Sequence, residues 1–146
     1  MAPPRGAWRG GAVTVVIGLG NPGEEYARTR HNLGWLVADE VAARLGWRWL
    51  RASSHYLIAA GGRGGAALTL LKPTTFMNRS GEAWLAWAGA AAPGEATDAA
   101  PPVAVCDDIA LPLGTVRIRA RGGTGGHRGL ESLAALKNLE SLVLKF

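Results

Sequence analysis

Residues 13–41 read VTVVIGLGNPGEEYARTRHNLGWLVADEV, and this stretch decides the fold. Val13–Ile17 is rich in β-branched apolar residues, which is typical of a strand buried on both faces of a parallel sheet. Gly18–Gly23 predicts a tight loop, and beyond it apolar residues recur at helical spacing, at Leu33, Leu36, Val37 and Val41. The stretch therefore predicts a strand, a loop and a helix, the repeating unit of α/β proteins.

His31 stands where the predicted helix begins. The positive end of the helix dipole favours a neutral imidazole there, and a neutral ring accepts protons. A second predicted strand, Val103–Cys106, ends in Asp107 and Asp108. Because the carboxyl ends of parallel strands meet at one edge, a carboxylate here can accept the ring N–H of His31 and stabilise its protonated form. The alternative is that both aspartates are ordinary turn residues.

The glycine loop also fits G-x-G-x-x-G, the fingerprint of dinucleotide-binding proteins. In that motif the helix begins within the glycines, whereas Pro22 and the polar residues that follow delay it here to about His31. The ribose-binding acid of the motif should end a second strand, but Asp39 lies within the helical pattern. These departures argue against a nucleotide site.

Length and composition fit one folded domain at residues 13–146, after a Pro-, Gly- and Arg-rich arm at residues 1–12 that we expect to be disordered. The formal net charge of +5 suggests a polyanionic partner. The single cysteine excludes an internal disulfide and fits a reducing, cytoplasmic compartment, and no apolar run approaches the ~20 residues that span a bilayer. The three histidines and the cysteine lack ligand spacing, so we expect no metal and no other cofactor.

The middle of the chain predicts a hairpin and a second helix. Tyr56–Ala60 and Ala66–Leu71 are the two hairpin strands, and helix signals follow from Ser80. Trp47–Leu50 predicts a further strand, whose tryptophans we interpret as packing residues, with base stacking as the alternative. From spacing alone, Asn78 is either a helix cap or a ligand of a substrate.

Thr115–Ala120 alternates between apolar and basic residues, which predicts a half-buried strand with an arginine face formed by Arg117 and Arg119 and continued by Arg121. Such a row can contact consecutive phosphates of an RNA, and a solvated strand face is the alternative. Gly122–Gly126 then leads into His127, Arg128 and a helix to about Leu139. Open amides before a helix start predict an anion site.

Three stretches resemble the bacterial-type peptidyl-tRNA hydrolase family. They read GLGNPGEEYARTRHNLGW in the opening stretch, LLKPTTFMNRSGEA at Leu70–Ala83 and VCDDIALPLGTVRIRARGGTGGHRGL at Val105–Leu130, and they span roughly residues 13–136. The resemblance implies one three-layer α/β/α domain with a twisted, mostly parallel mixed sheet. It also implies a monomeric enzyme of translation, without a cofactor, that hydrolyses the ester between a peptide and the 3′ end of tRNA.

By the same resemblance, His31 is the general base on water, Asp107 orients it, and Asn21 recognises the peptidyl end. Residues that bind substrate or the tRNA end in the family fall here on Tyr26, Phe76, Met77, Asn78 and Arg128. The arginine strand would contact the phosphates of the acceptor stem.

The chain also departs from the family pattern. Arg128 stands where the family most often has an asparagine, and Ala110 replaces a frequent aspartate. The family continues beyond Phe146, so the resemblance implies that its C-terminal part is missing here. A non-catalytic RNA-binding member of the same fold is the alternative function, and the presence of Asn21, His31 and Asp107 favours the enzyme.

Overall fold

A computed structural model describes residues 13–63, 66–90, 102–119, 124–136 and 142–146 of the chain. The expected N-terminal arm and Arg121 lie outside the described residues. Within the described ranges, no helix combines the length and the apolar character needed to cross a membrane.

Seven strands form one sheet in the part of the chain that the structure describes, in the order β2-β3-β4-β1-β5-β7-β6. The four central strands run parallel, and the pairs at both edges are antiparallel. Their bounds are β1 Val13–Gly18, β2 Leu50–Arg51, β3 Tyr56–Arg63, β4 Ala66–Pro73, β5 Val103–Cys106, β6 Arg117–Arg119 and β7 Leu142–Lys145. The mixed sheet with a parallel centre confirms the predicted class.

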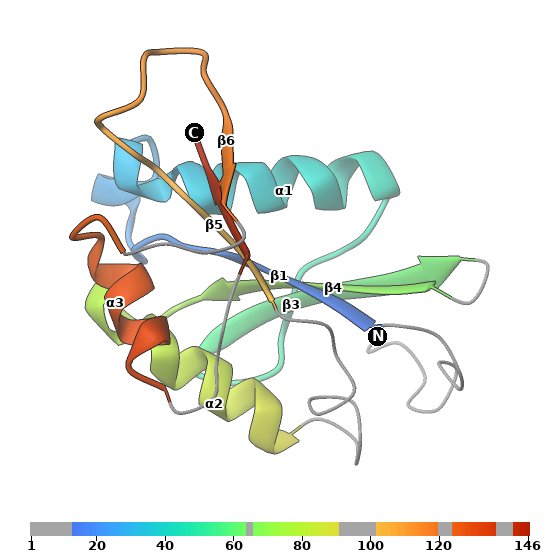
Figure 1. Cartoon of the computed structure of the whole chain (residues 1–146). Coiled ribbons are helices and arrows are strands. Elements are labelled where there is room, and N and C mark those ends of the chain that lie inside the picture. The colour runs from blue at the N-terminus through green and yellow to red at the C-terminus, as the bar shows by residue number, and fades with distance from the viewer. Residues whose placement is uncertain (1–12, 64–65, 91–101, 120–123, 137–141) are drawn as a thin grey trace.

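Helices cover both faces of this sheet, as Figure 1 shows. Helix α1, Leu33–Leu45, packs on one face against β1, β4 and β5, and α2, Ser80–Ala90, and α3, Arg128–Ala134, lie together on the other. Three short 3₁₀ turns precede or follow loops near the site: η1 Glu24–Tyr26, η2 Arg30–Asn32 and η3 Met77–Arg79. The arrangement is the three-layer α/β/α architecture expected from the sequence.

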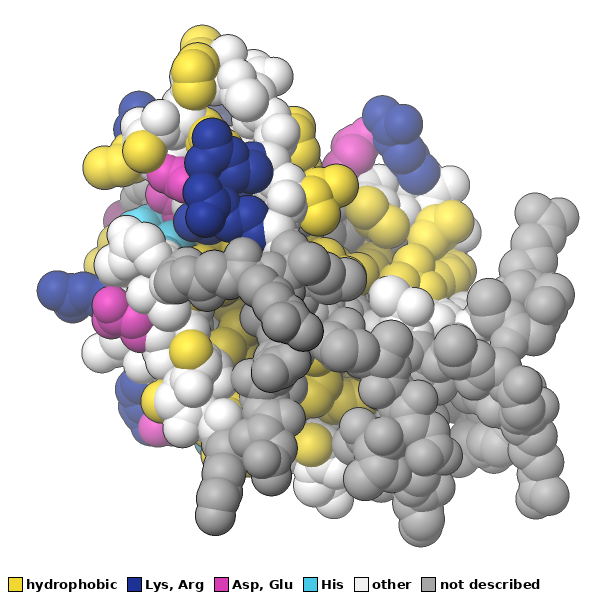
Figure 2. All heavy atoms as spheres, in the orientation of Figure 1, with side chains coloured by type: hydrophobic (Ala, Val, Ile, Leu, Met, Phe, Trp, Pro, Cys, Tyr) yellow, Lys and Arg dark blue, Asp and Glu magenta, His cyan; other side chains and the backbone are white. Residues whose placement is uncertain are grey.

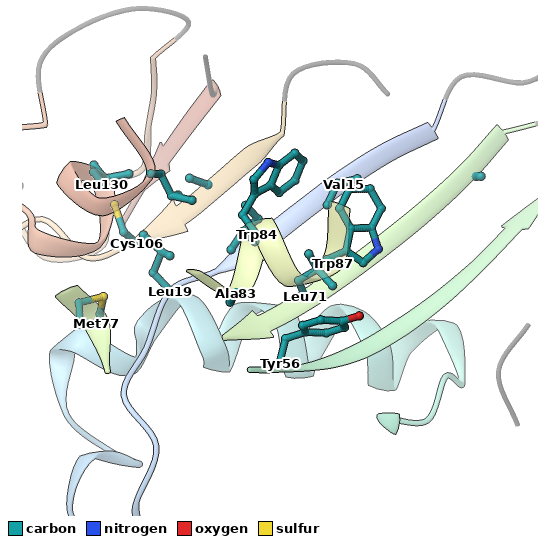
Figure 3. Packing of buried hydrophobic residues seen from close by; sticks show 14 residues of the cluster. Val15, Leu19, Tyr56, Leu71, Met77, Ala83, Trp84, Trp87, Cys106 and Leu130 are labelled. Carbon is teal, nitrogen blue, oxygen red and sulfur yellow. The ribbon is translucent and has the colours of Figure 1, made fainter. Parts of the chain in front are cut away.

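The main core lies between the sheet and the pair α2–α3. Figure 3 shows Trp84 and Trp87 of α2 beside Val15, Leu71 and Tyr56 of the sheet, and all five are buried in one apolar cluster. The two indole rings pack on each other at 5.0 Å between centroids. Since a fully buried Leu or Phe side chain contributes about 1.5–3 kcal/mol, this cluster is a major source of stability.

Helix α1 sits very close to the strand ends, because its first turn contains Gly34. A Cβ atom at Gly34 would lie 2.3 Å from Val105 O and 2.5 Å from Leu19 N, so only a hydrogen fits there. The helix ends at Gly46, whose φ of +70° is a left-handed conformation that glycine adopts without strain. These two glycines fix where the helix lies and where it stops.

Three element predictions need correction. The strand expected at Trp47–Leu50 is only Leu50–Arg51, because Trp47 packs its ring onto Gly61 instead of entering the sheet. Of the strand expected to be half-buried at Thr115–Ala120, the described residues 115–119 form only β6, and its Ile118 is 73 % exposed at the edge of the sheet, while Ala120 lies outside the described residues. Helix α3 ends at Ala134 rather than at about Leu139. Just after its end, the N–H of Leu136 donates to the carbonyl of Leu133, an i→i+3 bond that tightens the last turn.

Candidate active site

His31 and Asp107 meet at the carboxyl edge of the central strands. Asp107 follows β5 directly, and His31 lies in η2, just before α1. His31 Nδ1 lies 2.8 Å from Asp107 Oδ1, and Asp107 is 4 % exposed whereas the His31 side chain is 52 % exposed. An ionised carboxylate only accepts hydrogen bonds, so Nδ1 carries the proton and Nε2 keeps its lone pair. The ring therefore offers a proton-accepting atom in an exposed position.

Two opposing effects act on the Asp107 carboxyl. Burial by itself raises the pKa, but hydrogen bonds from His127 and His31 outweigh burial and hold the pKa of Asp107 below its ordinary value. Asp107 is thus ionised at neutral pH and can stabilise positive charge on His31.

His127 is a site residue that the sequence reasoning missed. Its Nε2 lies 3.0 Å from Asp107 Oδ1, the same oxygen that His31 contacts, and the two imidazole rings meet edge to face at 5.3 Å between centroids. Its Nδ1 accepts the backbone N–H of Gly129 at 3.1 Å and of Leu130 at 3.4 Å, so His127 caps α3. A signal was available, because His127 follows a glycine loop at the same edge of the sheet as Asp107.

This cap corrects the anion site expected at the start of the last helix. The amides of Gly129 and Leu130 already donate to His127, so they are not open to a phosphate. A single histidine side chain occupies the position that an anion would take.

Among the described residues, His31, Asp107 and His127 also form a group that could hold a metal ion by residue type, with their ligand atoms within 4.8 Å of one another. The hydrogen bonds argue against that use. Because His127 Nδ1 accepts two backbone N–H groups, the ring proton lies on Nε2, which then has no lone pair for a cation. The three side chains therefore fit a hydrogen-bonded triad better than a set of metal ligands.

Asn21 is held in one orientation by two neighbouring segments. Its Oδ1 accepts the backbone N–H of Met77 at 2.6 Å, which fixes the amide group and leaves Nδ2 without a partner among the described residues. Asn32, which is 1 % exposed, accepts the Asn21 N–H at 2.7 Å and donates to the Asn21 carbonyl at 2.9 Å. Sequence reasoning did not single out Asn32, although it follows His31 directly.

The other predicted site residues differ in exposure. Phe76 is 56 % exposed, and Asn78 and Arg128 are also exposed, while Tyr26 is half-buried in η1. Met77 is buried in the core, so what it offers the site is the N–H that holds Asn21. Asn78 lies in η3.

Figure 2 shows a group of Lys and Arg side chains beside His and acidic side chains on one face of the molecule. Arg117 and Arg119 of β6 are exposed, and Arg117 lies opposite Lys145 of β7 in the sheet register. Lys145 Nζ lies 3.4 Å from Asp108 Oδ2, and Asp108 is the residue next to Asp107 in the chain. The basic residues Lys145, Arg117 and Arg119 therefore lie beside the site.

A cavity of about 370 Å³ adjoins the same edge. Its walls are mostly apolar and come from residues 108–116, with Leu33 and Phe146, and Arg30 and Asp108 supply charge. Ile109 and Leu113 of this segment are 77 % and 105 % exposed, so the segment presents apolar side chains to solvent.

The protein is a three-layer α/β/α domain. At the carboxyl edge of its sheet it carries a histidine–aspartate pair and an oriented asparagine. This combination defines a class, an α/β protein equipped for acid–base chemistry on a bound ligand. The family model that matches is that of peptidyl-tRNA hydrolase, over residues 15–142. The chain belongs to the peptidyl-tRNA hydrolase family.

Curated relatives and a solved structure agree with this assignment. The chain is 47 % identical over 117 residues to the peptidyl-tRNA hydrolase of Rubrobacter xylanophilus and 43 % identical over 122 residues to that of Renibacterium salmoninarum. These alignments cover 80 % and 82 % of this chain but 62 % and 61 % of the relatives. The crystal structure of peptidyl-tRNA hydrolase from Acinetobacter baumannii matches with a TM-score of 0.79 at 30 % identity, over 91 % of this chain and 66 % of that one.

Proposed function

We propose that the chain hydrolyses the ester bond of peptidyl-tRNA and releases tRNA and peptide. The observation that carries the proposal is the His31–Asp107 pair, in which a buried, ionised carboxylate holds Nδ1–H and leaves Nε2 open toward solvent. An ester needs an activated water and a stabilised oxyanion, and one well-placed general base supplies the first. Family membership supplies the substrate class.

In the proposed reaction, His31 Nε2 takes a proton from a water molecule whose oxygen attacks the ester carbonyl carbon. The charge of Asp107 stabilises the imidazolium that forms. The carbon–oxygen bond to the tRNA 3′ end then breaks, and the proton on His31 passes to the departing oxygen. Asn21 Nδ2 and the Asn78 amide are donors for the substrate carbonyl groups, and a fixed amide lowers the cost of orienting them.

Binding of the two halves of the substrate would use different surfaces. Arg117 and Arg119 of β6 would contact phosphates of the acceptor stem, and we propose the same role for Arg121, which lies outside the described residues. Tyr26, Phe76 and Arg128 would contact the tRNA end. The largely apolar cavity at residues 108–116 suits side chains of the peptide. Because peptidyl-tRNA is a product of translation, we place this monomeric enzyme in the cytoplasm.

A cleavage assay on N-acetyl-aminoacyl-tRNA tests the proposal, with free aminoacyl-tRNA as the discriminating substrate. We expect hydrolysis of the blocked ester and a loss of at least about a hundredfold in kcat for His31→Ala, the usual share of a positioned general base. His55→Ala is the matched control, because His55 hydrogen-bonds only with Ser53, Ser54 and Thr74 in the described chain. Binding of tRNA without cleavage would instead identify a non-catalytic RNA-binding protein.

A further inference from the structure

We propose that His127 is a positioning residue that holds Asp107 in the orientation in which this carboxylate supports His31. The inference rests on the proposed function, because it assigns His127 a part in the same reaction. It follows from the geometry of one oxygen atom, Asp107 Oδ1, which both histidines contact.

The two contacts come from elements far apart in the chain. His31 lies 76 positions before Asp107 and His127 lies 20 positions after it, and their nitrogens approach Oδ1 at 2.8 Å and 3.0 Å. A carboxylate that accepts only from His31 can rotate about its side-chain bonds. A second donor on the same oxygen holds that oxygen in place, which keeps the His31 ring aimed in one direction.

His127 can act in this way because its own ring is fixed. The side chain is 8 % exposed, and both ring nitrogens are engaged, Nδ1 with the amides of Gly129 and Leu130 and Nε2 with Asp107. A flip of the ring would remove both sets of hydrogen bonds at once. The ring thereby joins the N-terminus of α3 to Asp107.

His127 also affects the charge that Asp107 presents to His31. A donated hydrogen bond draws negative charge toward His127, so its removal leaves Asp107 a stronger partner for protonated His31. Among the described residues, the other titratable groups beside Asp107 are Asp108, which is paired with Lys145 at 3.4 Å, and the thiol of Cys106. Burial raises the pKa of that thiol to about 12, so it stays neutral in the range of an assay.

Two substitutions separate the helix cap from the contact with Asp107. In His127→Asn the side-chain oxygen can take the place of Nδ1 and cap α3, but the shorter chain does not reach Asp107. In His127→Gln the terminal amide can take the place of Nε2 and donate to Asp107, but glutamine is a poor cap. The control for loss of a histidine is His55→Asn.

For the full chain acting on N-acetyl-aminoacyl-tRNA, we expect His127→Asn to lower kcat about tenfold with little change in KM, because a misaligned base acts in the transition state. The acid limb of its pH–rate profile should move to higher pH. Because a donor to the buried Asp107 carboxylate is lost, the Tm should also fall, but kcat should fall further than in a variant of equal Tm. His127→Gln should show a lower Tm with a much smaller loss of kcat.

If His127→Asn keeps the wild-type kcat and pH profile, His127 is only a helix cap and the inference is wrong. It is equally wrong if both variants lose kcat in proportion to Tm. Nitrogen NMR of the imidazoles provides a readout that needs no activity, and we expect the Nε2–H tautomer for His127. A wild-type chain that shows this tautomer but does not cleave would refute the proposed function and leave the contact with Asp107 standing.

Discussion

Asn32 and Asn21 exchange two hydrogen bonds, one from Asn21 N to Asn32 Oδ1 at 2.7 Å and one from Asn32 Nδ2 to Asn21 O at 2.9 Å. The buried side chain of Asn32 thus satisfies both the backbone N–H and the carbonyl group of Asn21, within the glycine loop. Because Asn32 follows His31 in the chain, the same short turn carries the proposed base and fixes the loop that bears Asn21.

Substitution of Asn32 by aspartate should lower both stability and activity. The carboxylate can still accept from Asn21 N, but its second oxygen would face the Asn21 carbonyl in a buried position. Loss of a buried hydrogen bond with an unsatisfied group left behind costs about 1–3 kcal/mol of unfolding free energy. Urea unfolding and kcat measure the two effects. Wild-type values for both would show that the loop is held by other contacts.

Asp107→Asn should keep tRNA binding and lower kcat, with the acid limb of the pH–rate profile moved to lower pH. The reason is that a neutral amide cannot stabilise positive charge on His31, so the base is weaker. This direction is opposite to the one expected for His127→Asn, although both changes affect the same carboxylate. A profile that does not move would mean that Asp107 is only a turn residue.

Asp107 should also affect how stability depends on pH. Its folded pKa lies below the ordinary value of 3.8, so the carboxyl stabilises the fold above that value and loses this contribution as the pH falls through the folded pKa. The difference in unfolding free energy between wild type and Asp107→Asn should therefore be largest near neutral pH and shrink in acid. Denaturant melts at several pH values provide the measurement, and a constant difference would contradict the ion–dipole contacts described for Asp107.

Replacement of Arg117 and Arg119 by alanine should weaken tRNA binding and flatten its salt dependence. Each lost phosphate contact reduces the slope of log affinity against log salt by about one. Both side chains are exposed on an edge strand, so the fold should tolerate the change. Binding titrations between low and moderate salt, with Arg44→Ala as a surface control on α1, give the slopes. Equal slopes for the double variant and the wild type would mean that Arg117 and Arg119 contact solvent and not phosphates.

Local patterns sufficed for elements whose own residues carry a strong signal. The β-branched apolar run Val13–Ile17 is a strong signal for a buried strand, and this prediction is confirmed. The meeting of His31 with Asp107 was also predictable, since Asp107 directly follows β5 and the helix start that carries His31 lies at the same edge of the sheet.

Features that depend on tertiary neighbours were not predictable. The exposure of Ile118 follows from the position of β6 at the sheet edge, and a two-residue alternation looks the same on an edge strand as on an inner one. The start of α3 was predicted to be an anion site because nothing in the sequence shows that the His127 ring accepts its backbone N–H groups. Asn32 resembled an ordinary helix-start residue, and only the path of the glycine loop brings Asn21 to it.

The closest approach in the site region, that of Gly34 to the strand ends, provides the last prediction. Gly34 lies three residues after His31, and the atoms that its Cβ would strike belong to Val105, two residues before Asp107, and to Leu19, two residues before Asn21. Gly34→Ala should therefore push α1 away from β1 and β5 and lengthen the distance from His31 to Asp107. Overpacking of this kind costs about 1–3 kcal/mol of unfolding free energy, and we expect kcat to fall further than that of a variant of equal stability.

Gly89→Ala is the matched control, because Gly89 lies in α2 with nothing within 4 Å of its Cβ position, and helix propensity makes this change neutral or stabilising by up to about 1 kcal/mol. Thermal melts and the cleavage assay on the two variants separate a packing effect at the site from a general effect of an added methyl group. Wild-type stability and kcat in Gly34→Ala would mean that α1 is not seated on the strand ends as described.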